Sequence, residues 1–387
     1  MDYLSRAKEL FSEMCEQRRH IHQLAELGME TVKTADYIQE QLAQVGIAST
    51  RMADNGVTAL IGQGKPVVLL RADIDALPVQ EQSGLPFAAQ NGHCHACGHD
   101  LHAAALLTAA KMLKENEADL KGTVKLMFQP GEEVMKGAVK MIEEGILTDP
   151  NVDAAMGLHV IGNIPTGMVV CGSGTVASSA DIVNIRVIGK GGHGASAHEC
   201  IDPISILVQI YQGIQSMLTR EIDFQQKVSL TFGDFNCGPG ATFNIIANEA
   251  HLSGTLRTFD EGVRQFILER LQEITEGIAH AFRAEGVFEH VSGLTCLTLD
   301  QTVTETMVDG LKKVIPDQVQ YTVNLQMNGS EDFAEVSNRV PSAFFAVGAG
   351  LTEYPQHNPK IVFNEEALIV GAVVYAQSAT EWLRANA

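Results

Sequence analysis

The stretch Pro66-Val-Val-Leu-Leu-Arg71-Ala-Asp-Ile-Asp75 passes from a short apolar strand directly into charged residues. Strands buried on both faces read as continuous apolar runs, and in open α/β sheets ligands gather at the carboxyl ends of such strands. The same pattern predicts further strands at Val57–Ile61, Val124–Phe128 and Ala154–Leu158. Helical patterns lie between them at Asp100–Lys114 and Gly131–Gly145. This alternation predicts an α/β fold with a mixed, largely parallel sheet and helices on both faces.

The pattern changes in the middle of the chain. Ile182–Ile188 alternates as a strand does, and Asp202-Pro203 is typical of a helix start. Two β-rich segments follow, at Lys227–Phe235 and Thr242–Arg257, joined by a turn at Gly238-Pro239-Gly240. A long helix is then predicted at Asp260–Arg283. We therefore expect an inserted α+β domain over 181–293, between the two parts of a first domain at 1–180 and 294–387.

Length and composition support a two-domain globular protein. The chain has 387 residues, of which 45% are hydrophobic and 19% charged. The formal net charge of −20 argues against nucleic acid and against anionic membrane surfaces as partners. We see neither a secretion signal nor an apolar run long enough to span a membrane, and therefore expect a cytoplasmic protein. The seven cysteines are scattered and do not resemble a disulfide framework.

Residue types that bind metals gather between Asn91 and Asp100, which hold three histidines and two cysteines. Further polar residues of this kind stand at predicted strand ends or helix starts, in Asp73-Ile-Asp75, Cys97-Gly-His99-Asp100, Gln129-Pro-Gly-Glu132-Glu133 and Gly157-Leu-His159. Thiolate, imidazole and carboxylate are ligands that zinc, manganese and cobalt select. Because strand ends meet at one edge of a sheet, we expect these segments to form one site.

The adjacent residues Glu132 and Glu133 have separate uses in such a site. Neighbouring side chains point in different directions, so one carboxylate can bind metal while the other faces a metal-bound water. A metal lowers the pKa of that water towards about 7, and a free carboxylate can then take its proton. The pair therefore indicates hydrolysis.

Four motifs together resemble the M20 metallopeptidases, and most closely their aminoacylase, hippurate hydrolase and auxin-conjugate amidohydrolase branch. The resemblance extends from the Arg18-Arg19-His20 region to the last helix. Its motifs are Arg71-Ala-Asp-Ile-Asp-Ala-Leu-Pro78, His95-Ala-Cys-Gly-His-Asp100, Gln129-Pro-Gly-Glu-Glu133 and Gly189-Lys-Gly-Gly-His-Gly194.

The resemblance implies a site for two divalent metal ions, which are manganese, zinc, cobalt or nickel. The ligands that it implies are Cys97, His99, Glu133, His159 and His357. Glu132 would be the general base and Asp73 a second catalytic acidic residue, with Asp75 orienting a ligand. The inserted domain would act as a lid and dimerisation domain, in a homodimer or a dimer of dimers. Its residues implied in substrate binding are His193, which would reach the partner's substrate, Asn244 and Arg257.

Relatives often have Ala in place of Gly131 and Ser in place of Asn358, and we expect the change at Gly131 to be tolerated. His102 is a candidate supporting residue behind the ligands, and Glu331 is expected to support the site rather than to react. The resemblance implies hydrolysis of N-acyl-L-amino acids or related small conjugates.

Three alternatives remain open. Gly189-Lys-Gly-Gly-His-Gly194 formally matches a dinucleotide-binding loop, but the next helix begins only near Asp202 and no acidic residue lies about twenty positions on. A carboxypeptidase or dipeptidase could use the same scaffold. A non-catalytic metal-binding protein could also have kept the fold, although Glu132 argues against it.

Overall fold

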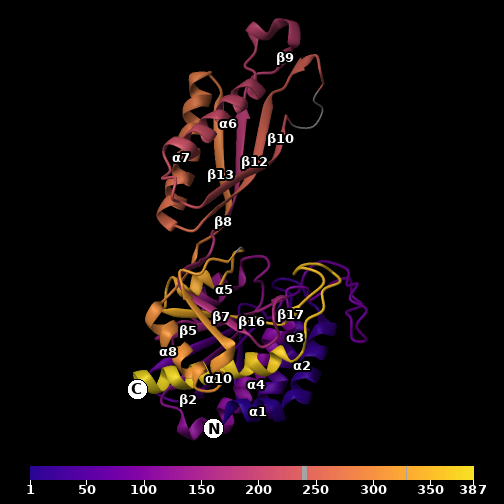
Figure 1. The fold of residues 1–387 in the computed structure, drawn as a ribbon. Helices are drawn as coiled ribbons and strands as arrows, with labels where there is room; N and C mark the ends of the chain where they lie inside the picture. Colours follow the sequence, from indigo (N-terminus) through magenta and orange to yellow (C-terminus); the bar gives the residue numbers. More distant parts are fainter. Residues whose placement is uncertain (238–241, 328) are drawn as a thin grey trace. The chain divides into compact units, whose positions relative to one another are not determined.

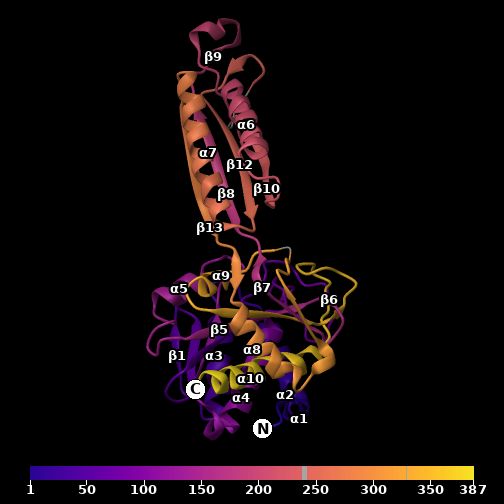
Figure 2. The same ribbon diagram turned by 60° about the vertical axis from the view of Figure 1, so that its left-hand side comes forward.

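The computed structural model describes residues 1–237, 242–327 and 329–387, so the predicted turn Gly238-Pro239-Gly240 lies outside the described residues. Contacts divide the chain into two compact units, which Figures 1 and 2 draw with helix and strand labels. The larger unit comprises Met1–Val176, Thr298–Gln326 and Glu331–Ala387. The smaller unit comprises Ala177–Leu297 and Met327–Ser330. No helix in the described residues is apolar over a length that could span a bilayer.

The larger unit is built on a sheet in which the described residues form nine strands. The order is β1-β2-β4-β3-β5-β16-β7-β14, and β15 pairs with β7. The central strands β4, β3, β5 and β16 run parallel, whereas β2 and β7 pair antiparallel at either side of them. The bounds are β1 Ser49–Met52, β2 Gly56–Gly62, β3 Val67–Asp73, β4 Thr123–Gln129, β5 Ala154–Ile161, β7 Val169–Ala177, β14 Leu297–Leu299, β15 Val319–Val323 and β16 Ser342–Gly348. A separate two-stranded sheet pairs β6 Asn163–Ile164 with β17 Gly350–Leu351.

Helices cover this sheet, as its apolar strands require. Strand β3 is buried throughout, and alternate residues Val68, Leu70 and Ala72 share a core with α4 and α10. Figures 1 and 2 show α10 beside α4 and α8. The helices are α1 Tyr3–Glu9, α2 Phe11–Leu24, α3 Val32–Gln44, α4 His99–Glu115, α5 Gly137–Glu143, α8 Gln301–Lys312, α9 Ala334–Ser337 and α10 Ala367–Asn386, with 3₁₀ turns η1 Glu117–Asp119 and η3 Pro316–Gln318. The prediction of a mixed α/β fold is confirmed.

The smaller unit is an α+β structure with an antiparallel sheet in the order β10-β12-β8-β13. Alternate residues Val183, Ile185 and Val187 share a core with helices α6 and α7, which Figure 2 shows side by side. The Asp202 side chain accepts a hydrogen bond from the Ile204 amide, which confirms the predicted helix start. The bounds are β8 Ala180–Ile188, β9 Gly192–His193, η2 Gly194–Glu199, α6 Pro203–Arg220, β10 Val228–Asn236, β11 Ile245–Ile246, β12 Glu249–Thr258, α7 Glu261–Ala281 and β13 Glu285–Leu294.

One predicted helix is shorter than its sequence pattern. Helix α5 begins at Gly137, not at Gly131, and the intervening residues form a turn. Gly131 has a φ of 68° and Met135 a φ of 55°, which are left-handed values that interrupt a right-handed helix. The prediction over Gly131–Gly145 was therefore wrong for its first six residues, and this difference places Glu132 and Glu133 on a turn.

Candidate metal centre

The larger unit brings the five predicted metal ligands together in two groups that share Cys97. One group is Cys97, His99 and His159, the other is Cys97, Glu133 and His357, and within each group the ligand atoms lie within 4.8 Å of one another. The Cys97 sulfur lies 3.3 Å from Nε2 of His159 and 3.3 Å from Nε2 of His357. Glu133 Oε1 lies 3.6 Å from His357 Nε2 and 3.9 Å from His99 Nε2.

The Cys97 turn depends on a glycine. Gly98 has a φ of 95° and immediately precedes α4, so that His99 becomes the first residue of the helix. A Cβ at this position would lie 2.4 Å from Cγ2 of Val160, on the strand that carries His159. Only glycine therefore allows the turn to approach β5 this closely, which puts the thiol and both imidazoles in one place.

The hydrogen bonds of the histidines leave one ring nitrogen of each available. Nδ1 of His99 lies 2.8 Å from the Asp75 carbonyl, and Nδ1 of His159 lies 2.7 Å from the Val160 carbonyl. Because a carbonyl only accepts, both Nδ1 atoms carry a proton, and in the neutral imidazole the lone pair is therefore on Nε2. These lone pairs face the shared thiol and the Glu133 carboxylate, as ligand atoms of a metal do.

Buried atoms without partners test whether a metal fits. Among the described residues, His99 Nε2 and Glu133 Oε1 are buried and have no hydrogen-bond partner. Burying a polar atom without a partner is costly, so two such atoms beside a thiol indicate that a further group belongs there. Thiolate, imidazole and carboxylate are the donor set of borderline divalent metals, and the residues present therefore fit the predicted ions.

The protonation of these groups is consistent with a bound cation. Burial holds the pKa of His159 well below its usual value, which keeps its imidazole neutral. Burial also disfavours a charged His99, but Asp73, Cys97 and Asp75 together outweigh it and raise the pKa of His99 well above its usual value, so a metal would have to displace that proton. A field that favours a proton on His99 also favours a metal cation there. Burial raises the pKa of the Cys97 thiol, so metal binding would have to release its proton.

The turn that carries Glu132 is held by Asp75. The Asp75 carboxylate accepts hydrogen bonds from the backbone amides of Glu132, at 3.1 Å, and of Glu133, at 3.2 Å. The Asp75 carbonyl accepts from His99. Asp75 thus orients a predicted ligand, as the sequence implied, and its carboxylate also positions the predicted base.

A buried group of charges lies behind Glu132. Arg71 is fully buried and lies 2.6 Å from Asp73, 2.9 Å from Glu331 and 2.8 Å from Asp332. One guanidinium thus faces three carboxylates. Burial, together with Glu331 and Asp332, raises the pKa of Glu132 well above its usual value, which suits a carboxylate that must accept a proton. Sequence reasoning gave Arg71 and Asp332 no role, because their pairing joins segments 261 residues apart.

His102 supports the site without an available ring nitrogen. Its Nδ1 lies 2.5 Å from the Asp73 carboxylate, and its Nε2 accepts from the Val160 amide at 2.8 Å. This assigns His102 to the supporting role that the sequence suggested. One carboxylate oxygen of Asp73 bonds to His102 and the other bonds to Arg71, so both oxygens have partners within the protein.

The space beside Gly131 is filled by Met29. A Cβ on Gly131 would lie 2.4 Å from the Met29 sulfur, in addition to the strain of a φ of 68°. We expect Gly131→Ala to lower the free energy of unfolding by about 1–3 kcal/mol in urea titrations. Gly46→Ala is the matched control, since Gly46 has a φ of 75° with nothing within 4 Å of the added Cβ. If Gly131→Ala costs no more than Gly46→Ala, or if Met29→Ala does not relieve the difference, the contact is unimportant.

A second buried ion network holds the start of α4. Asp100 Oδ2 lies 2.7 Å from Arg18 Nε and 2.8 Å from His22 Nδ1, and the other ring nitrogen of His22 lies 3.1 Å from Glu81. Burial lowers the pKa of His22, but Asp100 and Glu81 outweigh it and raise the pKa to about 9. His22 is therefore protonated at neutral pH, and it joins helix α2 to the residue that follows His99.

This network predicts a pH-dependent stability. Because the pKa of His22 rises from 6.5 to about 9 on folding, its contribution is complete below pH 6.5 and is lost as the pH rises through 9. The difference in unfolding free energy between the wild type and His22→Gln should therefore shrink by about 3 kcal/mol across that window. Urea titrations at several pH values measure it, with His20→Gln, an exposed neighbour, as the control. Parallel curves for the wild type and His22→Gln would exclude this role.

The predicted substrate-binding residues belong to the smaller unit. His193 pairs with Ile245 across β9 and β11, and the Gly194 amide donates to the Asn244 carbonyl at 2.9 Å, so His193 and Asn244 come together. The His193 side chain is exposed, and its Nδ1 accepts from the Ala195 amide at 3.1 Å. Arg257 lies on β12 and donates to Ser330 Oγ at 2.6 Å. Their roles toward a substrate stay predictions.

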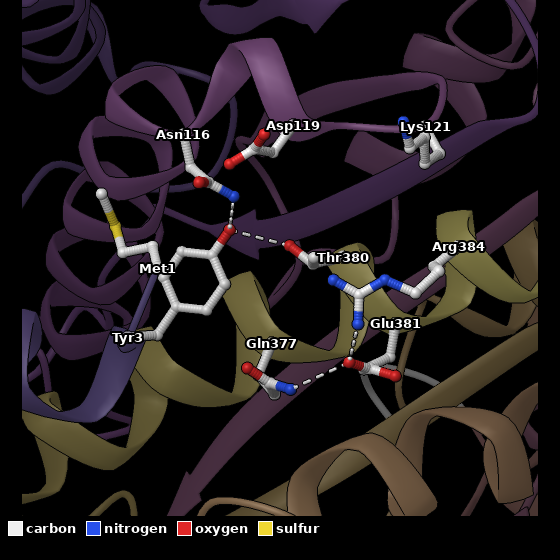
Figure 3. Close-up of a pocket in the computed structure, with 9 residues that line it drawn as sticks. All are labelled: Met1, Tyr3, Asn116, Asp119, Lys121, Gln377, Thr380, Glu381 and Arg384. Atoms are coloured by element: carbon white, nitrogen blue, oxygen red, sulfur yellow. Dashed lines mark hydrogen bonds and ion pairs between the residues drawn. The ribbon is translucent and has the colours of Figure 1, made fainter.

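A cavity of about 330 Å³ in the larger unit is separate from the metal ligands. Figure 3 shows its polar groups bonded to one another: Tyr3 with Asn116 and Thr380, and Glu381 with Gln377 and Arg384. Asn116 and Lys121 precede β4, whereas Glu133 follows the carboxyl end of β4 and His159 lies near the carboxyl end of β5. The cavity therefore lies toward the opposite edge of the sheet, and we assign the chemistry to the ligand cluster.

Comparisons with known proteins point to one family. The model of peptidase family M20/M25/M40 matches residues 69–381. The chain is 36% identical to N-acetyl-L-cysteine deacetylase of Bacillus subtilis, over 95% of this chain and 88% of the relative. It is 32% identical to thermostable carboxypeptidase 2 of Saccharolobus solfataricus, over 97% of this chain and 96% of the relative. The crystal structure of the Bacillus subtilis YXEP protein, described as a dinuclear metal-binding peptidase of the M20 family, superposes with a TM-score of 0.84 at 32% identity, covering 97% of this chain and 99% of that chain.

Proposed function

Because the chain belongs to peptidase family M20/M25/M40, we propose that it hydrolyses the amide bond of N-acyl-L-amino acids or related small amino-acid conjugates. The observation that carries the proposal is the shared cluster around Cys97, in which buried ligand atoms of His99 and Glu133 have no partner among the described residues. Beside it stands Glu132, whose pKa is raised by burial and by neighbouring carboxylates. The cluster supplies ligands and the adjacent carboxylate supplies a base.

In the proposed site Cys97, His99, Glu133, His159 and His357 hold two divalent metal ions, which are manganese, zinc, cobalt or nickel. When bound, the ions polarise the amide carbonyl and lower the pKa of the attacking water. Glu132 takes the proton of that water and passes it to the leaving amine nitrogen. Asp75 holds the Glu132 turn through two backbone amides, and Arg71 fixes Asp73.

The smaller unit is proposed to bind the rest of the substrate. His193 would donate to the scissile carbonyl of a partner's substrate and stabilise the negative charge that develops on it. Arg257 would pair with a free substrate carboxylate, which its guanidinium matches in a bidentate geometry, and Asn244 would contribute a polar contact. The proposal includes a cytoplasmic homodimer or dimer of dimers. The partly exposed apolar side chains of Ile204, Val208 and Tyr211 on α6 support an association surface.

An activity screen tests the proposed function. Protein freed of metal with a chelator is reloaded with manganese, zinc, cobalt or nickel singly and assayed on N-acetyl amino acids and on dipeptides. Release of acetate from N-acetyl amino acids in a metal-dependent manner is the expected result. Faster cleavage of dipeptides would favour a carboxypeptidase or dipeptidase; one relative is named a carboxypeptidase. The absence of hydrolysis in every metal-loaded form would favour a non-catalytic metal-binding protein.

A further inference from the structure

Among the predicted ligands, His357 is the one least fixed by packing against other side chains. It lies in the segment 352–366, between β17 and α10, which has no helix or strand of its own. Its side chain is 55% exposed and its φ is 68°. The His357 amide donates to the Ala96 carbonyl at 3.0 Å, so the backbone is bonded to the turn that carries Cys97. The position of His357 therefore depends on the hydrogen bonds that attach this segment to the other ligands.

The side chain of Gln356 makes two of these attachments. Its amide nitrogen lies 3.3 Å from the Cys97 carbonyl and 3.1 Å from the Val160 carbonyl. A primary amide has two N–H groups, so Gln356 can donate one to each carbonyl. These carbonyls are 259 and 196 residues away in sequence, in the ligand turn and in strand β5.

Both carbonyls belong to segments that carry predicted ligands. The Val160 carbonyl also accepts from Nδ1 of His159, which sets the lone pair of that histidine toward Cys97. The Cys97 carbonyl is part of the turn that holds the shared thiol. Gln356 is itself bonded covalently to His357. One side chain thus connects the segments of three ligands.

We propose that Gln356 is a positioning residue that arranges Cys97, His159 and His357 before a metal binds. This inference rests on the proposed function. Ligands held in place by outer hydrogen bonds lose less freedom on binding, and the loss of such a partner typically lowers metal affinity by about 10–100-fold. Gln356 contacts no substrate in this role, because it acts through backbone carbonyls.

Cobalt binding to the metal-free protein tests the inference. Gln356→Met retains a long unbranched side chain but removes both N–H groups, and Gln356→Glu turns a carboxylate oxygen toward two carbonyl oxygens. We expect the dissociation constant for Co²⁺, measured by competition with a chromophoric chelator, to rise by about 10–100-fold in both variants. The visible absorption of bound Co²⁺ should also change, since it reports the geometry of thiolate and imidazole ligands. Gln90→Met, at an exposed glutamine bonded to the Ala88 carbonyl, is the matched control and should bind Co²⁺ as the wild type does.

The outcomes separate this inference from the proposed function. Wild-type affinity and an unchanged Co²⁺ spectrum in either folded variant would overturn the role of Gln356. Failure of both variants to show a thermal unfolding transition would also overturn it, because Gln356 would then be needed for folding instead. A wild type that binds no Co²⁺ would overturn both proposals. A wild type that binds Co²⁺ but hydrolyses no amide would overturn the proposed function alone.

Discussion

Glu132→Gln is expected to lower kcat for N-acyl amino acid hydrolysis by about 10²–10⁴-fold, the usual contribution of a general base. Glutamine has the volume of glutamate but cannot accept a proton from the attacking water. The backbone amide of residue 132 would still donate to Asp75, so the turn should keep its shape. Because Glu132 is not a predicted ligand, two metal ions should remain bound.

Steady-state kinetics and metal analysis of the same samples measure both effects. Glu143→Gln, at an exposed residue of α5, is the matched control and should retain wild-type kcat. Since the pKa of Glu132 is raised, the wild type should also lose activity on the acidic side, as the base becomes protonated. Unchanged hydrolysis by Glu132→Gln would remove Glu132 from the mechanism.

Cys97→Ala is expected to reduce metal affinity by more than about 100-fold and to abolish hydrolysis at stoichiometric metal. This loss of affinity exceeds the effect of removing a residue that only hydrogen-bonds to a ligand. The Cys97 thiol belongs to both ligand groups, so its loss weakens both predicted metal positions. The buried atoms of His99 and Glu133 would then face a methyl group. Elemental analysis after dialysis and competition titration measure the loss.

Cys94→Ala is the control for Cys97→Ala. Cys94 is also a buried thiol, three residues earlier, but it belongs to none of the ligand groups found among the described residues. We expect Cys94→Ala to keep two metal ions and wild-type kinetics. Retention of both ions by Cys97→Ala, or their loss from Cys94→Ala, would contradict the assignment of the thiol.

Local patterns were sufficient where a side chain's role depends on its neighbours in sequence. The apolar run before Arg71 predicted strand β3, and Asp202 predicted the start of α6, because strand burial and helix capping involve adjacent residues. The helix predicted from Gly131 was wrong at its start because the conformation there depends on a residue distant in sequence. Its periodicity fits a helix, but the turn that replaces its first six residues is held by Asp75, which lies two residues after strand β3.

The contact between Asp75 and Glu132 illustrates the difference between what the sequence determined and what only the tertiary structure decided. Sequence alone determined the α/β class and, through the resemblance of its motifs, the family of the chain and the candidate ligands. Only the tertiary structure decided that Cys97 is shared by both ligand groups, that Asp75 holds the base and that Gln356 joins three ligand segments. These relations are hydrogen bonds and close contacts between residues up to 260 positions apart, and their geometry is set by packing of the whole sheet rather than by any local pattern.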